Sequence, residues 1–99
     1  MFIYNVTVNI NDDSNNSWVT WMKELHMPEV MKTGCFIDCQ LVKVLYLEDE
    51  GHTYSAQYKF LEMIDIENYQ KHFAPKLQAE HSQKFKDKYT AFRTILQIV

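Results

Sequence analysis

The feature that most constrains the fold is the succession of two hydrophobic periodicities along a short chain. Residues 2–10 alternate between apolar and polar side chains, which is typical of a half-buried strand whose apolar face consists of Tyr4, Val6, Val8 and Ile10. From Trp18 onwards the apolar residues recur at helical spacing instead. Alternation returns over residues 53–62, and a second helical pattern follows it. Strands and helices are therefore predicted to be mixed within one α+β unit.

The remaining segments complete the order strand, helix, strand, strand, helix, strand. Residues 35–47 are predicted to form a long strand, Gly51 to turn the chain into the strand 53–62, and residues 89–99 to form the last strand. Helices that follow the first and third strands require right-handed crossovers, which gives a ferredoxin-like βαββαβ sandwich. We predict a single domain over residues 1–99, with a four-stranded antiparallel sheet, both helices on one face, and the last strand beside the first.

The first helix contains a proline that is expected to end it. Pro28 lacks the N–H of a helical residue and restricts Met27, so the helix should stop near Leu25 or His26. Pro28 would then begin a separate short turn, and His26 would cap the helix C-terminus. The helix is expected to bury the stripe Trp18, Trp21, Met22 and Leu25.

The second helix is predicted to begin with Asp65 as its cap, to be interrupted by Pro75, and to resume to about Lys86. Its buried stripe is Ile66, Tyr69, Phe73 and Leu77. The same helical phase places Glu80 and His81 near the side that faces the sheet. A carboxylate beside an imidazole has two interpretations: acid–base chemistry, or a structural pair that satisfies two polar groups.

Composition excludes several classes of protein. The formal net charge is -3, and the ten basic residues are spread thinly, which argues against a nucleic-acid partner. No apolar run approaches the ~18 residues of a spanning helix, so no membrane association is expected. The N-terminus alternates and lacks the basic start of a signal peptide. These features predict a soluble cytoplasmic protein.

Cysteines and histidines do not form a metal-binding pattern. Cys35 and Cys39 fall in a predicted strand, where four residues span about 13 Å, too far for one metal or one disulfide. No two histidines have the i, i+4 spacing that holds a metal on one helix face. A phosphate-binding glycine loop and a nucleophile elbow are also missing from the pattern. We therefore predict no metal and no cofactor.

Five segments carry a resemblance to a known family: "IYNVTVNI", "WVTWMKELHMPEVMKTGCF", "TYSAQYKF", "APKLQAEHSQKF" and "AFRTILQIV". The chain resembles, nearly end to end, an uncharacterised family of small bacterial proteins catalogued as a domain of unknown function. That family is similar to the dimeric α/β-barrel group, which includes cofactor-free monooxygenases, small isomerases and proteins with no known activity. The resemblance implies the fold and a dimer, and it leaves the reaction class open. His26, Glu80 and His81 fall in its motif-like segments.

The sheet face opposite the helices is the most informative surface that the pattern predicts. Its expected residues are Asn5, Thr7, Phe36, Asp38, Gln40, Val42, Val44, Ser55, Gln57, Ala91, Arg93, Ile95 and Gln97. Such a face is too apolar for a solvated sheet and too polar for a dry core between two sheets. We predict a homodimer through this face, with Arg93 as its key polar residue and a partly wet cavity between the two sheets.

Two functional hypotheses follow. The first is a non-enzymatic homodimer that holds a small organic ligand between its sheets. The second is a cofactor-free enzyme, monooxygenase-like or isomerase-like, that acts on a small carbonyl or aromatic substrate with Arg93 or His81 as its polar catalyst. The lack of a catalytic signature favours the first. The candidate ligand-binding residues are Arg93, Asp38, Gln57, Asn5, His26, Glu80 and His81.

Overall fold

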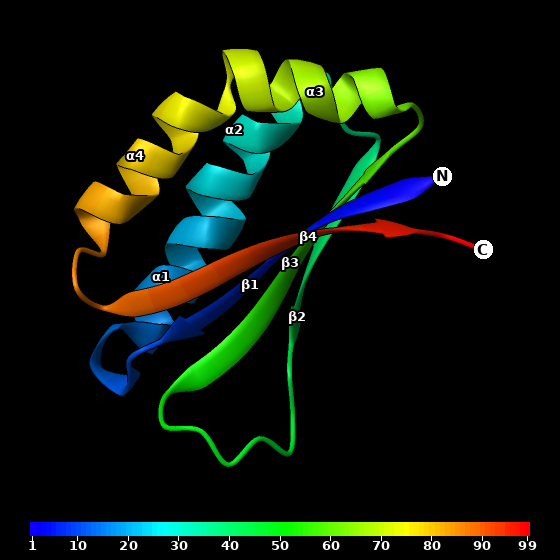
Figure 1. Cartoon of the computed structure of the whole chain (residues 1–99). Helices are drawn as coiled ribbons and strands as arrows, with labels where there is room; N and C mark the ends of the chain where they lie inside the picture. The colour runs from blue at the N-terminus through cyan, green and yellow to red at the C-terminus, as the bar shows by residue number, and fades with distance from the viewer.

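The computed structural model describes residues 1–99 and has the predicted ferredoxin-like fold (Figure 1). Four antiparallel strands form one sheet in the order β2-β3-β1-β4, so the last strand lies beside the first. Their bounds are β1 Phe2–Ile10, β2 Asp38–Lys43, β3 His52–Phe60 and β4 Tyr89–Gln97. The β2 strand is thus shorter than the segment 35–47 that alternation predicts.

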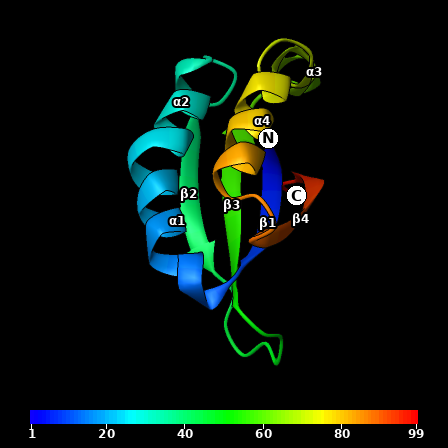
Figure 2. The ribbon, with the colours of Figure 1, turned by 90° about the vertical axis from the view of Figure 1, so that its left-hand side faces the viewer.

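All the helices cover one face of this sheet. They are α1 Asn15–Trp21, α2 Met27–Lys32, α3 Met63–His72 and α4 Ala74–Lys84, with a 3-10 turn at Asp12–Ser14 before α1. Figure 2 shows α1 and α2 on the side of β2, α4 nearer the middle of the sheet, and β4 beyond the helices at the edge. The helix-facing side of β4 is therefore only partly covered. None of these helices has both the length and the apolar character needed to cross a bilayer.

The first helical segment continues through Pro28, so the prediction that this proline ends the helix was wrong. A π-helical turn, Met22–His26, joins α1 to α2, and the backbone stays in the right-handed helical region. Pro28 falls at the start of α2, directly after this wide turn, where the missing N–H is tolerated. The extra residue in the turn also changes the helical phase. Leu25, predicted to be buried, is 51% exposed, and His26 turns toward the sheet.

The second helical segment breaks beside Pro75, as predicted. Phe73, between α3 and α4, leaves helical geometry with φ -125°. The start of this helical segment differs from the prediction, because Glu62 and not Asp65 is the N-cap. Asp65, the third helical residue, accepts a hydrogen bond from the Glu62 backbone N–H and completes a capping box. Phe73 is exposed and does not continue the buried stripe, and α4 ends at Lys84.

The hydrophobic core lies between the sheet and the helices and includes Phe36, which was wrongly assigned to the open face. Phe36 is 5% exposed and its ring packs against those of Tyr4, Tyr58 and Tyr69. Regular pairing in β2 begins only at Asp38. Alternation cannot be extended back through the irregular residues before it, so the predicted facing of Phe36 fails.

The register of β4 reverses another prediction. Val8 pairs with Ala91 and Val6 with Arg93, and residues paired across antiparallel strands share a face. Val8 is buried beneath the helices, so Ala91, Arg93, Ile95 and Gln97 face the helix side, and Phe92 and Leu96 face the open side. Arg93 is therefore not on the open face. Large apolar residues occur on both faces of this edge strand, so the alternation of apolar and polar residues did not show which face points toward the helices.

Candidate functional site

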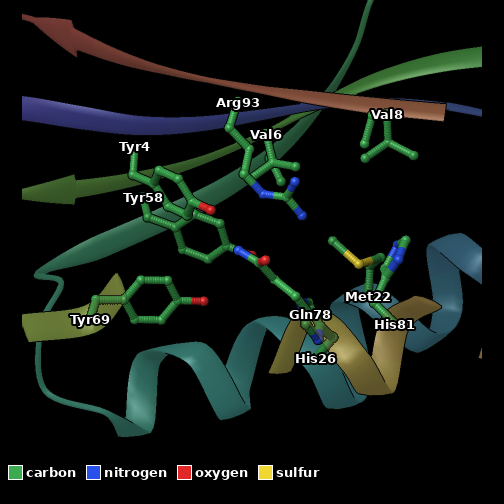
Figure 3. A pocket seen from close by; sticks show the side chains of 12 residues that line it. Tyr4, Val6, Val8, Met22, His26, Tyr58, Tyr69, Gln78, His81 and Arg93 are labelled. Atoms are coloured by element: carbon green, nitrogen blue, oxygen red, sulfur yellow. The ribbon is translucent and has the colours of Figure 1, made fainter. Parts of the chain in front are cut away.

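A small cavity of about 30 Å³, partly open to solvent, lies between the sheet and the helices, close to the partly covered strand β4. Twelve residues line it, and their side chains come from three strands, the π-helical turn and the helices α3 and α4 (Figure 3). Its apolar wall includes Val6, Val8, Met22, Ala56 and Ala91. Its polar lining residues are Tyr4, Tyr58, Tyr69, Gln78, His26, His81 and Arg93.

Arg93, the only arginine of the sequence, supplies the positive charge of this cavity. Its side chain leaves β4 beside Val6 and points into the space between sheet and helices, toward Gln78 (Figure 3). No aspartate or glutamate lines the cavity, and none of the three ion pairs of the chain involves Arg93. The guanidinium therefore faces the cavity without a counter-ion from the protein.

His81, on α4, is held in one neutral form by a hydrogen bond from Trp18. The Trp18 indole Nε1–H donates to His81 Nε2 at 2.9 Å. An indole nitrogen can only donate, so Nε2 accepts and the ring proton sits on Nδ1. Burial, then the neighbouring His26, then Arg93 lower the pKa of His81 to about 4. At neutral pH this 8% exposed imidazole is therefore uncharged, with Nδ1–H as a donor.

His26 enters the same cavity from the π-helical turn. Its ring stacks on Trp21 with centroids 4.8 Å apart, and its centroid lies 5.8 Å from that of His81. Burial, followed by the charge of Arg93, lowers the pKa of His26 to about 4. His26 Nδ1 is buried and has no hydrogen-bond partner in the chain. Unpartnered buried polar atoms are rare, and each requires an explanation such as a catalytic role or a bound water or ion.

Three tyrosines bring further polar atoms to the cavity: Tyr4 from β1, Tyr58 from β3 and Tyr69 from α3. Their hydroxyls make no side-chain hydrogen bond within the chain, whereas Tyr54, outside the cavity, donates to Asn15 Oδ1 at 2.6 Å. Burial raises the pKa of Tyr58 and of Tyr69. These two hydroxyls therefore stay protonated and free to donate or accept a hydrogen bond.

The open face of the sheet carries a different polar arrangement, which we call the polar ladder. Asn5 Nδ2 donates to Thr94 Oγ1 at 3.1 Å, and Ser55 Oγ donates to Asn5 Oδ1. Gln57 Nε2 donates to Ser55 Oγ at 3.1 Å, and Gln40 Nε2 donates to Gln57 Oε1 at 2.9 Å. This chain of hydrogen bonds crosses all four strands. These side chains have partners within the chain, so covering the face leaves few of them unsatisfied.

Apolar side chains flank the polar ladder on the open face. Phe92 is 61% exposed, and Leu96 and Val42 are also exposed. Among the open-face residues of the four strands, only Asp38 and Lys59 are charged. An uncovered sheet face with few charges and several exposed apolar residues is a candidate interface.

The whole of residues 1–99 matches the family model described as "Domain of unknown function (DUF4286)". The chain belongs to the DUF4286 family. Membership agrees with the resemblance that the sequence motifs carry. No curated protein matches the sequence.

Solved structures with the same fold are similar to this DUF4286 chain over nearly its whole length. HapK from Hahella chejuensis has a TM-score of 0.72 at 10% identity, covering 100% of this chain and 93% of HapK. A dimeric ferredoxin-like protein from an uncultured marine organism has a TM-score of 0.70 at 13% identity, covering 99% and 96% of the two chains. An ethyl tert-butyl ether D (EthD) family protein from Bacillus halodurans has a TM-score of 0.68 at 11% identity, covering 100% of both. At these identities the similarity concerns the fold.

The structure divides the predicted site residues between two faces. It brings Arg93, His26 and His81 together in the cavity. Asn5, Asp38 and Gln57 lie on the open face, on the other side of the sheet. The seven residues therefore do not form one site between two sheets.

Glu80 is exposed and does not join His81 in the cavity. Successive residues of a helix point about 100° apart, so only one of two neighbours can face the sheet directly. The prediction that both turn inward was wrong. His26 is likewise a residue in the middle of a continuous helical segment and not a C-terminal cap.

Sequence reasoning missed the tyrosine hydroxyls, Gln78 and the Trp18–His81 hydrogen bond. The aromatic residues were interpreted as core, and their rings are core residues. The available signal was the choice of tyrosine over phenylalanine at inward strand positions, because a buried hydroxyl requires a partner. Tyr4 and Tyr58 both occupy such positions.

The polar atoms of the cavity surround one positive charge, and the guanidinium, the His81 Nδ1–H and the tyrosine hydroxyls can all donate hydrogen bonds. No group of three or more His, Cys, Asp or Glu side chains lies close enough to hold a metal ion, and Cys35 and Cys39 are both free thiols. Donors of this kind bind oxygen atoms of a ligand. The cavity has a volume of only about 30 Å³, but its lining combines apolar walls with a few convergent polar groups, as small-molecule sites do.

Proposed function

We propose that this DUF4286 protein is a homodimer in which each protomer binds a small organic ligand in the cavity between its sheet and its helices. The observation that carries the proposal is the convergence on one cavity of polar groups without a side-chain partner in the chain: the exposed Arg93 guanidinium, the buried His26 Nδ1 and three tyrosine hydroxyls. The ligand position differs from the one predicted between two sheets, because Arg93 faces the helix side.

The energetic reason is the cost of leaving His26 Nδ1 unsatisfied, since it is the one buried side-chain polar atom without a partner. A buried polar atom without a partner costs about 1–3 kcal/mol, and a fold normally avoids that cost. A ligand or water that bonds His26 Nδ1 removes it. Val6, Val8 and Met22 would then contact the apolar body of the ligand.

The dimer proposal rests on the open face. A second copy placed by a two-fold axis would cover Phe92, Leu96 and Val42 with the same surface. The polar ladder tolerates this burial, because its members already bond to one another. One of the similar solved structures is described as a dimeric ferredoxin-like protein, which supports the same assembly here.

A cofactor-free enzyme is the second candidate function, and the unpartnered Nδ1 of His26 favours it as a proton acceptor. Proton transfer at neutral pH is most effective when the pKa of the base lies near the working pH. The pKa values of His26 and His81, both lowered to about 4, make them weak bases. Ligand binding is therefore the better supported of the two.

The binding test is native mass spectrometry of the purified protein, followed by NMR titration with a fragment library. We expect a co-purified molecule, or fragment-induced shifts at His26, His81 and Arg93. The variant Arg93→Met should lose the ligand, and Glu80→Gln, on the exposed side of α4, should retain it. Shifts confined to residues outside the cavity would reject the site. A bound molecule that is converted during incubation would establish the enzyme instead.

The assembly test is sedimentation velocity at low micromolar concentration. We expect a dimer for the wild type and a monomer for the double variant Phe92→Glu/Leu96→Glu, since both side chains are exposed on the open face. Lys71→Glu, on the exposed side of α3, is the control and should remain dimeric. A wild-type monomer under these conditions would exclude the interface.

A further inference from the structure

We infer that the ligand of the cavity is a small organic carboxylate with an apolar body, held by the Arg93 guanidinium and the Nδ1–H of His81. This inference rests on the proposed function and names its ligand class. Trp18 enters as a positioning residue, because its indole N–H determines which nitrogen of His81 carries the proton.

The charges around the cavity select an anion. Arg93 is the one formally charged residue among the twelve that line the cavity. It has no ion pair in the chain, so its planar fork of N–H donors is free for a bidentate carboxylate. A cationic ligand would meet this charge with no carboxylate to offset it.

The tautomer of His81 selects a hydrogen-bond acceptor. Because Trp18 occupies His81 Nε2, the ring can offer the ligand only the Nδ1–H donor. Protonation of His81 would add a proton at Nε2 and break the bond with Trp18. The pair therefore keeps His81 a neutral donor, which suits a carboxylate oxygen and gives nothing to an ammonium group.

The single charge distinguishes a carboxylate from a phosphate. No lysine lines the cavity, and both histidines are neutral at physiological pH, so the site balances one negative charge. A phosphate monoester carries about -1.5 to -2 charges at pH 7. The apolar wall formed by Val6, Val8 and Met22 matches the hydrocarbon part of a carboxylic acid.

The test compares matched probes that differ only in charge. Benzoate, benzamide and benzylamine are titrated into 15N-labelled protein at pH 7, with NMR shifts locating the site and calorimetry giving the affinity. We expect benzoate to bind about tenfold or more tightly than benzamide, and benzylamine not to bind in the cavity. Arg93→Met should remove this preference. Lys59→Met, on the open face, should preserve it.

The role of Trp18 needs a readout that packing alone would not change. The 15N shifts of the His81 ring report which nitrogen is protonated. In the wild type we expect Nδ1–H; in Trp18→Phe, which keeps an aromatic ring but loses the donor, we expect a mixture of tautomers and weaker benzoate binding. An unchanged tautomer with unchanged affinity would overturn the positioning role.

The possible failures are distinguishable. Equal affinity of benzamide and benzoate, or a neutral or cationic molecule co-purified in the cavity, overturns the carboxylate inference and leaves the proposed binding function standing. If benzoate, phenylacetate and 2-naphthoate all fail to shift His26, His81 and Arg93, the carboxylate inference also falls. If in addition no fragment of the library shifts these residues, the proposed function falls with it.

Discussion

The two faces of the sheet use polar side chains in opposite ways. On the open face, Asn5, Ser55 and Gln57 bond to one another within the polar ladder. On the helix side, His26 Nδ1 and the Arg93 guanidinium have no partner in the chain. A face whose polar groups are already paired can be covered by another protein surface at low cost. A cavity whose polar groups are unpaired is suited to a ligand that pairs them.

Charge separates the two faces as well. The helix-side cavity has one cation and no carboxylate, whereas Asp38 and Lys59 occur together on the open face and pair across neighbouring strands in the register. Burial lowers the pKa of His26 and of His81, so both imidazole rings are uncharged at neutral pH. The difference is the basis of the proposal that association uses the open face and small-molecule recognition uses the cavity.

The largest difference in stability is expected between two variants, each of which truncates one aromatic side chain on a different face of the sheet. Trp18, with 0% exposure, supports the helix side, and Phe92, with 61% exposure, lies on the open side. Trp18→Ala should lower the free energy of unfolding by about 3–5 kcal/mol, through the lost packing of the indole. Phe92→Ala should change it by less than about 1 kcal/mol in dilute protein. Urea denaturation measures both, and similar losses would contradict the assignment of the core to the helix side.

Acidification should weaken the helix side selectively. The pKa values of His26 and His81 fall from 6.5 to about 4 on folding, so the unfolded chain binds more protons between these values. The stabilisation from the neutral rings is complete above pH 6.5 and is lost as the pH falls toward 4. One pKa unit corresponds to about 1.4 kcal/mol, so we expect a loss of about 2 kcal/mol per histidine between pH 6.5 and 5.

Urea denaturation between pH 7.5 and 5 measures this loss while most carboxylates remain ionised. His81→Gln and His26→Gln should each flatten the pH dependence. The control His72→Gln, on the exposed side of α3, should leave it unchanged. An equal slope in the wild type and in the double variant His26→Gln/His81→Gln would show that the two rings are not the source.

The polar ladder should contribute less than the core and the histidines. Asn5→Ala removes the central member, so the Ser55 hydroxyl loses its acceptor and Thr94 loses its side-chain donor. A loss of about 1–2 kcal/mol is expected in the monomer, because the face is open to water. Thr90→Ala, on the same face, is the matched control and should be close to neutral. Denaturation curves that coincide for the two variants would reject an energetic role for the ladder.

The fold was predictable because several local signals agreed. Alternation in β1 and β3, the break at Pro75 and the turn at Gly51 all matched the structure. At Gly51, with φ 79°, an added Cβ would approach the Ile10 carbonyl oxygen to 2.7 Å, so glycine is required there. The π-helical turn had no comparable signal, since Pro28 normally predicts an end and not a wide turn.

The candidate site was only partly predictable, because it depends on which way each side chain points from its helix or strand. His26, His81 and Arg93 were all identified as candidates, yet their meeting place required the π-helical turn and the facing of β4. Each is a shift of a single residue, and a shift of one residue in a strand moves a side chain to the other face of the sheet. Arg93 shows this most clearly, because it was predicted to face the open side and its register with Val6 turns it toward the helices.

The smallest effect is expected from Glu80, and it tests the boundary between cavity and surface at adjacent residues. Glu80 is exposed on α4, and its neighbour His81 is buried against Trp18. Glu80→Gln should change the free energy of unfolding by less than about 0.5 kcal/mol, because a surface charge without a close partner contributes little. It should also leave benzoate binding unchanged.

His81→Leu, one residue away, supplies the contrast. It removes the acceptor of the indole N–H and the donor at the cavity, so stability and benzoate affinity should both fall. Paired urea curves and titrations of the two variants measure the difference. Loss of benzoate binding in Glu80→Gln at unchanged stability would place the carboxylate in the site. Glu80 and His81 would then both face the cavity in the ligand-bound protein, as helical phase alone predicted.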